Sequence, residues 1–214
     1  MRIETINQNN PDQQLLNTAA ELLKNGKVII HPTETVYGLA GDFLSESALQ
    51  EIVRLKSRHV AQPFSIMVNC LDQILDLMGK LPEWIEHFLN IIFPDAITVL
   101  LPRRLDLSLE YWNQFPLIGF RFPNHKISNS LVSLTKKPMV TTSANLSGEP
   151  PPIEISKINT ELISQVPLIL DGGITKKKVP STIIRIDEKN KKVFLVRSGA
   201  VDWKIIEKSF GEWL

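Results

Sequence analysis

Side chains that could bind an anionic ligand collect at the ends of several apolar runs in this sequence. The letters PMV lead directly into Thr141, Ser143 and Asn145, a dense set of small hydrogen-bonding groups. A segment with helical spacing ends in Lys56 and Arg58. Lysine and arginine supply cations for phosphate and carboxylate groups, and hydroxyls and amides add neutral hydrogen bonds. The pattern therefore predicts a binding site for a phosphate or carboxylate compound.

Two further arginines follow or interrupt apolar runs. Arg121 lies inside LIGFRF, and Arg197 follows KVFLV. If the strand face that carries Arg121 is buried, its guanidinium needs an anionic partner. That partner is either a carboxylate of the protein or a carboxylate of the ligand, and the sequence leaves both open. Thr35, in PTET, and Ser181, in VPST, stand at other polar strand ends.

Each signal also has a structural reading. PTET is typical of a turn or a helix N-cap. Cations at a helix end, such as Lys56 and Arg58, complement the helix dipole, and lysine runs usually form solvated faces. What favours a ligand site is that all these signals occur together in one small domain.

The composition excludes several other classes of site. Lys and Arg number 24 against 23 Asp and Glu, so the formal net charge of +1 gives no global reason to bind a polyanion. A single cysteine, Cys70, excludes a disulfide framework and a cysteine zinc site. The four histidines lack metal-ligand spacing, and no P-loop, dinucleotide fingerprint, HExxH or GxSxG motif is present. Without a signal sequence or membrane-length apolar run, we expect a cytoplasmic protein with no membrane contact and no metal site of its own.

The elements that would position these residues alternate along the chain. Helices are predicted over 11–25, 45–58, 71–78, 82–92 and 128–137, with a short one near the end. Strands are predicted over 27–32, 64–69, 96–102, 117–122, 138–142, 168–173, 181–187 and 192–199. The last two, joined by EKNK, read as an antiparallel hairpin. We therefore expect a single α/β domain over 1–214, built on a mixed sheet with flanking helices.

Six motifs in order and spacing carry a family resemblance: HPTETVYGLAGD, KSR, GFRFP, TTSANLSG, PSTIIRI and LVRSGA. Together they resemble the YrdC-type threonylcarbamoyl-AMP synthases over about 26–200. The resemblance implies a twisted, open, largely parallel sheet with a concave face. Because the sequence stops at Leu214, we expect the single-domain form of the family.

The family's reaction would be a nucleotidyl transfer. L-threonine and bicarbonate give an N-carboxylated threonine, which attacks the α-phosphate of ATP to give threonylcarbamoyl-AMP and pyrophosphate. Mg²⁺ would accompany ATP, and tRNA-modification proteins would use the adenylate to make threonylcarbamoyladenosine.

The resemblance also assigns roles to the candidate residues. Lys56 and Arg58 would be catalytic and bind ATP, together with four further ATP ligands: Thr141, Ser143, Asn145 and Arg197. Threonine would be bound by Thr35, Arg121 and Ser181.

The sequence departs from the family pattern at several positions. His59, Gln62 and Pro63 follow KSR where Pro and a Lys-Pro or Asn-Pro pair are common, and Met67 lies where some members have a histidine. The alternative function is a non-catalytic double-stranded-RNA-binding or ribosome-associated protein of the same fold, with direct tRNA or RNA contact. A carbamoyl-adenylate module of hydrogenase maturation is disfavoured, because such modules accompany zinc fingers. Intact KSR and SAN motifs favour the synthase.

Overall fold

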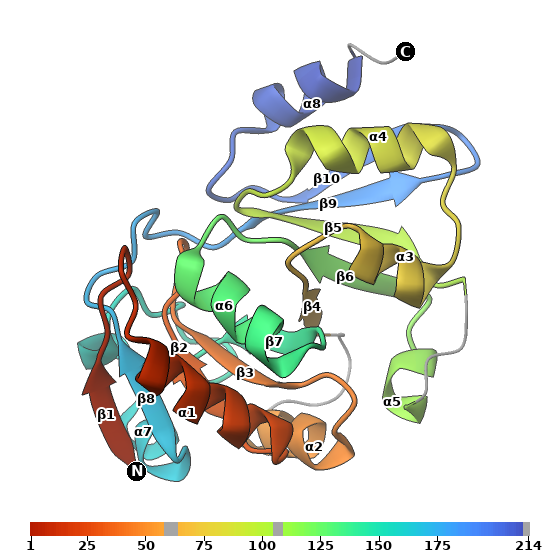
Figure 1. The fold of residues 1–214 in the computed structure, drawn as a ribbon. Helices are drawn as coiled ribbons and strands as arrows, with labels where there is room; N and C mark the ends of the chain where they lie inside the picture. The colour runs from red at the N-terminus through yellow and green to blue at the C-terminus, as the bar shows by residue number, and fades with distance from the viewer. Residues whose placement is uncertain (58–63, 105–108, 212–214) are drawn as a thin grey trace.

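The computed structural model describes residues 1–57, 64–104 and 109–211 (Figure 1). Its strands are β1 Arg2–Thr5, β2 Ile29–His31, β3 Gly38–Asp42, β4 Ser65–Met67, β5 Ile97–Pro102, β6 Leu117–Arg121, β7 Met139–Ser143, β8 Leu168–Asp171, β9 Thr182–Asp187 and β10 Lys192–Arg197. Its α-helices are α1 Gln13–Lys24, α2 Glu46–Leu55, α3 Asp72–Met78, α4 Glu83–Ile92, α5 Glu110–Asn113, α6 Lys126–Thr135, α7 Thr160–Gln165 and α8 Trp203–Gly211, and a 3₁₀ turn covers Ile155–Lys157.

The described strands form one open sheet in the order β1-β8-β2-β3-β7-β4-β6-β5-β9-β10. The predicted open mixed sheet is confirmed, and so is the antiparallel hairpin of β9 and β10. Four of the nine neighbouring pairs are parallel and five are antiparallel. The parallel share is therefore smaller than the resemblance implied, because β3 runs against both of its neighbours.

Helices cover both faces of the sheet because its central strands are apolar on both sides. In β2, Ile29 packs in a cluster with Leu16 and Leu131 of α1 and α6, whereas Ile30 packs in the other, larger cluster. Successive side chains of a strand point to opposite faces, so these clusters lie on opposite sides of the sheet. Figure 1 shows α1 and α6 side by side over β2, β3 and β7. The opposite face carries most of the other helices, including α4 and α8, where Phe210 contacts Phe88 edge-on.

Local signals explain how the first helix begins and ends. The Asp12 side chain accepts a hydrogen bond from Leu15 N at 2.7 Å, so Asp12 is the N-cap. The prediction that Pro11 opens the helix was therefore early by two residues. Gly26, expected just past the end, has φ +69°, a conformation that favours glycine, and a side chain there would meet Ser45 Oγ.

Two described strands, β1 and β3, and two described α-helices, α5 and α7, were not predicted, and neither was the 3₁₀ turn. β3 has the sequence GLAGD, which lacks the β-branched residues that mark strands. It is nevertheless paired along its length with β2 and β7, and its first four residues are buried. β1 is a short, largely exposed edge strand.

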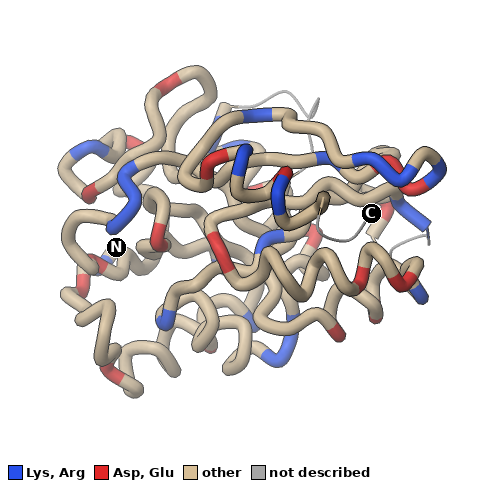
Figure 2. The backbone as a smooth tube through the Cα atoms, turned by 90° about the horizontal axis from the view of Figure 1, so that it is seen from above, with Lys and Arg blue, Asp and Glu red and all other residues tan. Residues whose placement is uncertain are grey.

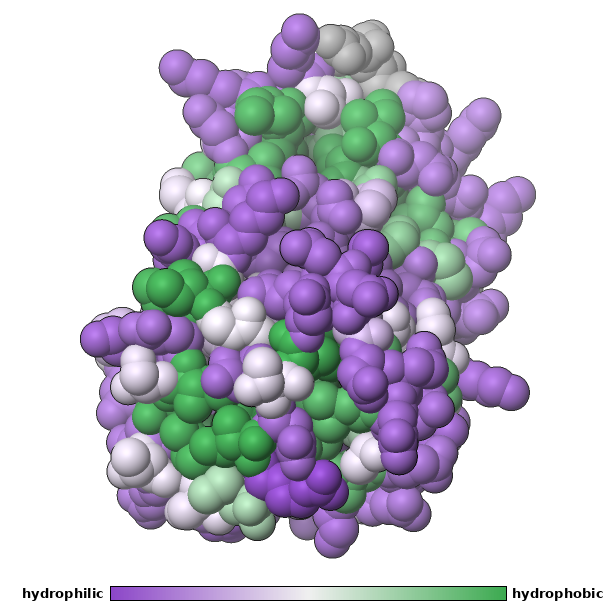
Figure 3. Space-filling model, turned by 60° about the vertical axis from the view of Figure 1, so that its left-hand side comes forward, coloured by the Kyte–Doolittle hydropathy of each residue, from purple (hydrophilic) through white to green (hydrophobic). Residues whose placement is uncertain are grey.

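Charged residues of both signs are spread over the described parts of the chain. Basic and acidic residues are intermixed along the chain (Figure 2), as the net charge of +1 suggests. On the side seen in Figure 3, apolar side chains reach the surface in patches that hydrophilic ones separate.

Candidate functional site

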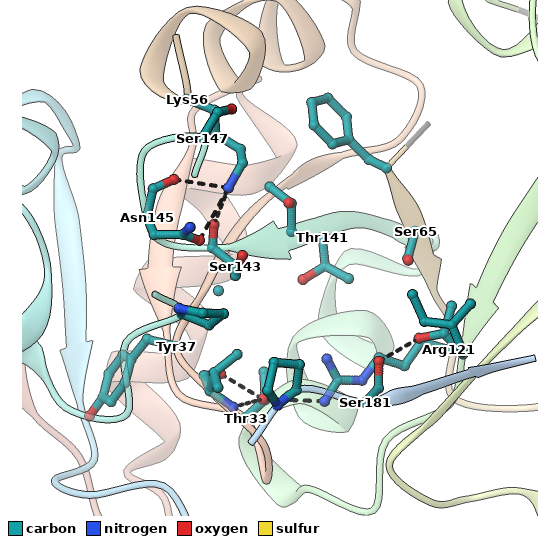
Figure 4. A pocket seen from close by; sticks show the side chains of 18 of the residues that line it. Thr33, Tyr37, Lys56, Ser65, Arg121, Thr141, Ser143, Asn145, Ser147 and Ser181 are labelled. Atoms are coloured by element: carbon teal, nitrogen blue, oxygen red, sulfur yellow. Dashed lines mark hydrogen bonds between the residues drawn. The ribbon is translucent and has the colours of Figure 1, made fainter. Parts of the chain in front are cut away.

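A pocket of about 630 Å³ lies on the same sheet face as α1 and α6, over the ends of the central strands (Figure 4). In β7, Met139 packs under α1 and α6 while Thr141 and Ser143, on the same face, line the pocket. Seven of the predicted site residues line it: Lys56, Arg121, Thr141, Ser143, Asn145, Ser181 and Arg197. The sheet therefore brings together residues from five widely separated sequence motifs.

Lys56 forms one end of the pocket. Its side chain is buried, and Nζ donates to Ser143 O at 2.7 Å, to Asn145 O at 2.9 Å and to Asn145 Oδ1 at 3.3 Å. In return, Lys56 O accepts a hydrogen bond from Ser147 N at 3.1 Å. The end of α2 and the turn after β7 are thus fastened to each other in both directions.

Asn145 fixes the turn that follows β7. Its Nδ2 donates to Leu146 O at 2.9 Å and to Glu149 O at 2.7 Å, while its Oδ1 accepts from Lys56. An amide group is suited to this place because it donates and accepts at the same time. Asn145 therefore shapes the loop as well as lining the pocket.

Hydroxyl groups without internal partners line the middle of the pocket. The hydroxyls of Ser65, Thr141, Ser143 and Ser147 make no hydrogen bond to any described residue, and each of these residues lines the cavity. Figure 4 shows them around the space between Lys56 and Arg121. Such groups can serve a polar ligand without first losing a bond inside the protein.

Arg121 forms the opposite end of the pocket. Its Nη2 donates to Glu34 Oε1 at 2.9 Å, to Thr33 Oγ1 at 3.3 Å and to Thr35 Oγ1. Arg121 is 8% exposed, and its Nε is buried without a partner among the described residues. The sequence left open whether Arg121 pairs with the protein or with a ligand. It pairs with Glu34 and also lines the pocket.

Thr35 lies behind the pocket wall instead of on its surface. It is fully buried, its carbonyl accepts from Thr175 Oγ1 at 2.7 Å, and its hydroxyl is bonded to Thr33 and Arg121. Thr33 donates its own proton to Val36 O at 2.7 Å, so Thr35 is the donor in the bond between the two hydroxyls. A direct threonine contact for Thr35 is therefore not part of this arrangement, in which Thr35 supports Arg121.

Ser181 and Arg197 complete the Arg121 end. Ser181 Oγ is 2.8 Å from Thr98 Oγ1, and Arg197 Nη2 donates to Ser181 O at 2.8 Å. An irregularity in β10 between Leu195 and Arg197 brings Arg197 opposite Ile183, another pocket residue. Burial and then the positive charge of Arg121 lower the pKa of Arg197. Two guanidinium groups thus act on the same region, as an anion site requires.

Two buried histidines lie near this end. Burial lowers the pKa of His31 to about 3, and both its ring nitrogens lack hydrogen-bond partners among the described residues. Burial also lowers the pKa of His125 to about 4, and its Nδ1 caps α6. Both imidazoles are therefore neutral at neutral pH.

Some predicted positions lie elsewhere. Arg58, His59 and Gln62 are outside the described residues, so their roles stay predictions. Met67 is buried in the cluster under α1 and α6 and does not line the pocket.

Sequence reasoning missed several pocket residues, among them Ser65 and Thr98. A hydroxyl within an apolar strand was the available signal for both. Glu34 lies within the polar PTET motif, but sequence reasoning assigned it no role of its own.

The described residues contain no group of three or more His, Cys, Asp or Glu side chains that could hold a metal ion. None of the helices in the described ranges has the length and apolar character that crossing a bilayer needs.

Comparisons with known proteins match this architecture. The family model Sua5_yciO_yrdC, described as "Telomere recombination", matches residues 21–199. A threonylcarbamoyl-AMP synthase from Pyrococcus abyssi is 31% identical over 92% of this chain and 57% of its own length. One from Pseudoalteromonas translucida is 30% identical over 86% of this chain and 98% of its own length.

A solved structure shares the fold. The crystal structure of P. abyssi Sua5 complexed with L-threonine superimposes with a TM-score of 0.90 and 29% identity, covering 99% of this chain and 62% of that one. This chain thus spans little more than half of the P. abyssi relative but nearly all of the P. translucida one. On the family model and these relatives, the chain belongs to the Sua5/YciO/YrdC family.

Proposed function

We propose that this protein is an L-threonylcarbamoyladenylate synthase, a nucleotidyltransferase that uses L-threonine, bicarbonate and ATP. The observation that carries the proposal is the arrangement of one pocket with Lys56 at one end, Arg121 at the other and unbonded hydroxyls between. Relatives that match most of this chain carry the name of this enzyme. The P. abyssi protein, whose fold this chain shares, forms a complex with L-threonine. This supports the proposal that one end of the pocket binds an amino acid.

The phosphates of ATP are assigned to the Lys56 end. There the charge of Lys56 and the hydroxyls of Thr141 and Ser143 would stabilise the negative charge that moves onto pyrophosphate. Arg58 is a further cation of the proposal, and Arg197 would contact the phosphates from its place beside Ser181, where the two ends of the pocket meet. Lys56 already donates to three oxygens, so its contact with a phosphate requires that one of these bonds be exchanged.

Threonine is assigned to the Arg121 end, where the guanidinium would bind its α-carboxylate and Ser181 would contribute a hydroxyl. The amine of threonine reacts with bicarbonate to form an N-carboxylate, and a water molecule is released. One oxygen of that carboxylate then forms a bond to the α-phosphorus, and the bond from this phosphorus to pyrophosphate breaks. The protein's contribution is to hold both substrates in line within one cavity.

Magnesium would arrive with ATP and neutralise part of the phosphate charge. Because the described residues contain no cluster suited to hold a metal, its ligands would be phosphate oxygens and water. The adenylate would then pass to tRNA-modification proteins.

One assay tests the proposal. Purified protein should release pyrophosphate from ATP when threonine and bicarbonate are both present, and omission of either should abolish release. Release of orthophosphate with ADP, or pyrophosphate release that does not depend on threonine, would instead favour a nucleotide- or RNA-binding protein of the same fold.

A further inference from the structure

Arg121 and Arg197 differ in how their charges are balanced. Arg121 is paired with Glu34 at 2.9 Å, and their side chains are only 9% and 5% exposed. Arg197 donates to the neutral oxygens of Ser181, and it makes no ion pair with any described residue. Arg121 is therefore compensated by a carboxylate, whereas no described carboxylate compensates Arg197, whose charge stays available to the phosphates.

Among the described residues, the Glu34 carboxylate pairs with Arg121 alone. Its Oε2 is buried and has no hydrogen-bond partner among the described residues, so no second donor shares its charge. Its backbone is held in place as well, because Glu34 O accepts from Lys177 N at 2.8 Å. The neighbouring His31 and His125 are neutral and add no competing cation at neutral pH. The charge of Glu34 thus acts on Arg121 from a fixed position.

We propose that Glu34 is a specificity-determining residue that adapts the Arg121 end to a zwitterionic amino acid and makes it reject phosphate. Arg121 and Glu34 form a fixed pair of opposite charges, and their combined field favours a zwitterion whose carboxylate lies on Arg121 and whose ammonium lies toward the Glu34 side, without contact to Glu34. A polyphosphate has no positive group to place near Glu34, so the carboxylate repels it. This assignment rests on the proposed function and adds to it a reason why the two substrates occupy different ends.

The same contact fixes the orientation of the guanidinium. All hydrogen bonds that Arg121 makes to described residues run through Nη2, toward Glu34, Thr33 and Thr35. Nη1 is then left for the pocket, into which Arg121 projects between Thr33 and Ser181 (Figure 4), whereas Nε is buried. Glu34 therefore acts through Arg121 and does not itself touch the ligand.

Glu34→Gln tests the proposal, because it keeps the shape of the side chain and removes its charge. Calorimetric titrations would use L-threonine and inorganic tripolyphosphate as probes, at low and high salt. In the wild type, tripolyphosphate should leave threonine affinity unchanged, and threonine binding should depend little on salt. In Glu34→Gln, threonine should bind about tenfold more weakly. Tripolyphosphate should now displace threonine at low salt, and high salt should suppress this displacement.

Glu34→Asp is the matched control, since it keeps the charge. It should still reject tripolyphosphate even if the shorter side chain weakens threonine binding. A melting curve for each variant verifies folding. If Glu34→Gln does not fold, the wild type and Glu34→Asp still test the proposal, because displacement of threonine by tripolyphosphate in either protein would overturn it.

The outcomes separate this inference from the proposed function. If the wild type does not bind threonine at all, the proposed function is refuted. The other outcome is that the wild type binds threonine while Glu34→Gln equals it in affinity, salt dependence and tripolyphosphate rejection. That outcome refutes the role of Glu34 and leaves the proposed function standing.

Discussion

Lys56 and Asn145 are 89 residues apart in sequence, yet Lys56 Nζ donates to both the carbonyl and the side-chain oxygen of Asn145. The KSR and SAN motifs are therefore in direct contact before any ligand arrives. Because Ser147 N also donates to Lys56 O, neither motif can move without disturbing the other. The two motifs form one structural unit at the Lys56 end of the pocket.

Replacing Lys56 by Ala should weaken ATP binding. A lost charge-assisted hydrogen bond is worth about 1.5–3 kcal/mol, which corresponds to roughly 10- to 150-fold in affinity. Because Lys56 also holds the turn after β7, its loss should lower the melting temperature too. Calorimetric titration of ATP and a melting curve measure both effects.

Lys24→Ala is the control: Lys24 also stands at a helix end, but it is exposed, and its loss should change neither quantity. ATP affinity equal to the wild type would mean that Lys56 is purely structural.

Arg121→Lys should separate the two substrates. Lysine keeps the charge and can still pair with Glu34, but it loses the planar fork that would hold both Glu34 and a ligand carboxylate. Threonine affinity should therefore fall more than ATP affinity, with a lower melting temperature because a buried ion pair is disturbed. Titrations of both ligands and a melting curve test this. A destabilised variant with unchanged threonine affinity would make Arg121 a structural residue.

Stability should fall in acid partly through His31. Its pKa is about 3 in the folded state and about 6.5 when unfolded, so the unfolded state binds more protons between these values. The stabilisation is complete above pH 6.5 and declines as the pH falls toward the folded value. Between neutral pH and pH 5 the loss is about 2 kcal/mol, because the slope approaches 1.36 kcal/mol per pH unit below pH 6.5.

His31→Gln removes this titration. Urea unfolding of wild type and variant at neutral pH and at about pH 5 compares the acid-induced losses. The variant should lose about 2 kcal/mol less than the wild type across this interval. Equal losses would show that His31 is not held neutral by burial.

Gly199→Ala should damage the Arg121 end from a position outside the pocket. A Cβ at Gly199 would overlap the backbone of Pro180 and Ser181, which cannot yield as a flexible side chain can. We expect a destabilisation of about 1–3 kcal/mol and weaker threonine binding, because Ser181 and Arg197 must shift. Gly211→Ala, in α8 with open space around it, should be neutral or stabilising. Wild-type behaviour of Gly199→Ala in melting and titration would refute this account.

The sequence was sufficient wherever a local pattern carries the information. The β9–β10 hairpin follows from two apolar runs around EKNK, and Asp187 closes that turn by accepting from Asn190 N at 3.1 Å. Strand ends rich in hydroxyls and cations also identified seven residues of the pocket without reference to a fold.

What the sequence could not supply depends on pairing between distant segments. Arg121 meets Glu34 across 87 residues, so no local pattern could decide between an internal and an external partner. Thr35 was assigned to threonine by the family resemblance, but its burial behind Arg121 is a property of the assembled sheet. The GLAGD strand is specified by its neighbours, since its own residues have little preference for a strand.

The strand order has a consequence for how the protein is made. β1 pairs with β8, so Arg2 lies beside Leu168, and the pocket needs β10 to supply Arg197. Contacts between such distant segments close large loops and slow folding. During synthesis, the Lys56 and Arg121 ends cannot both be complete until Arg197 has left the ribosome. The growing chain therefore passes through most of its synthesis without the stabilisation that ligands give a finished binding site, and it depends on its apolar core alone.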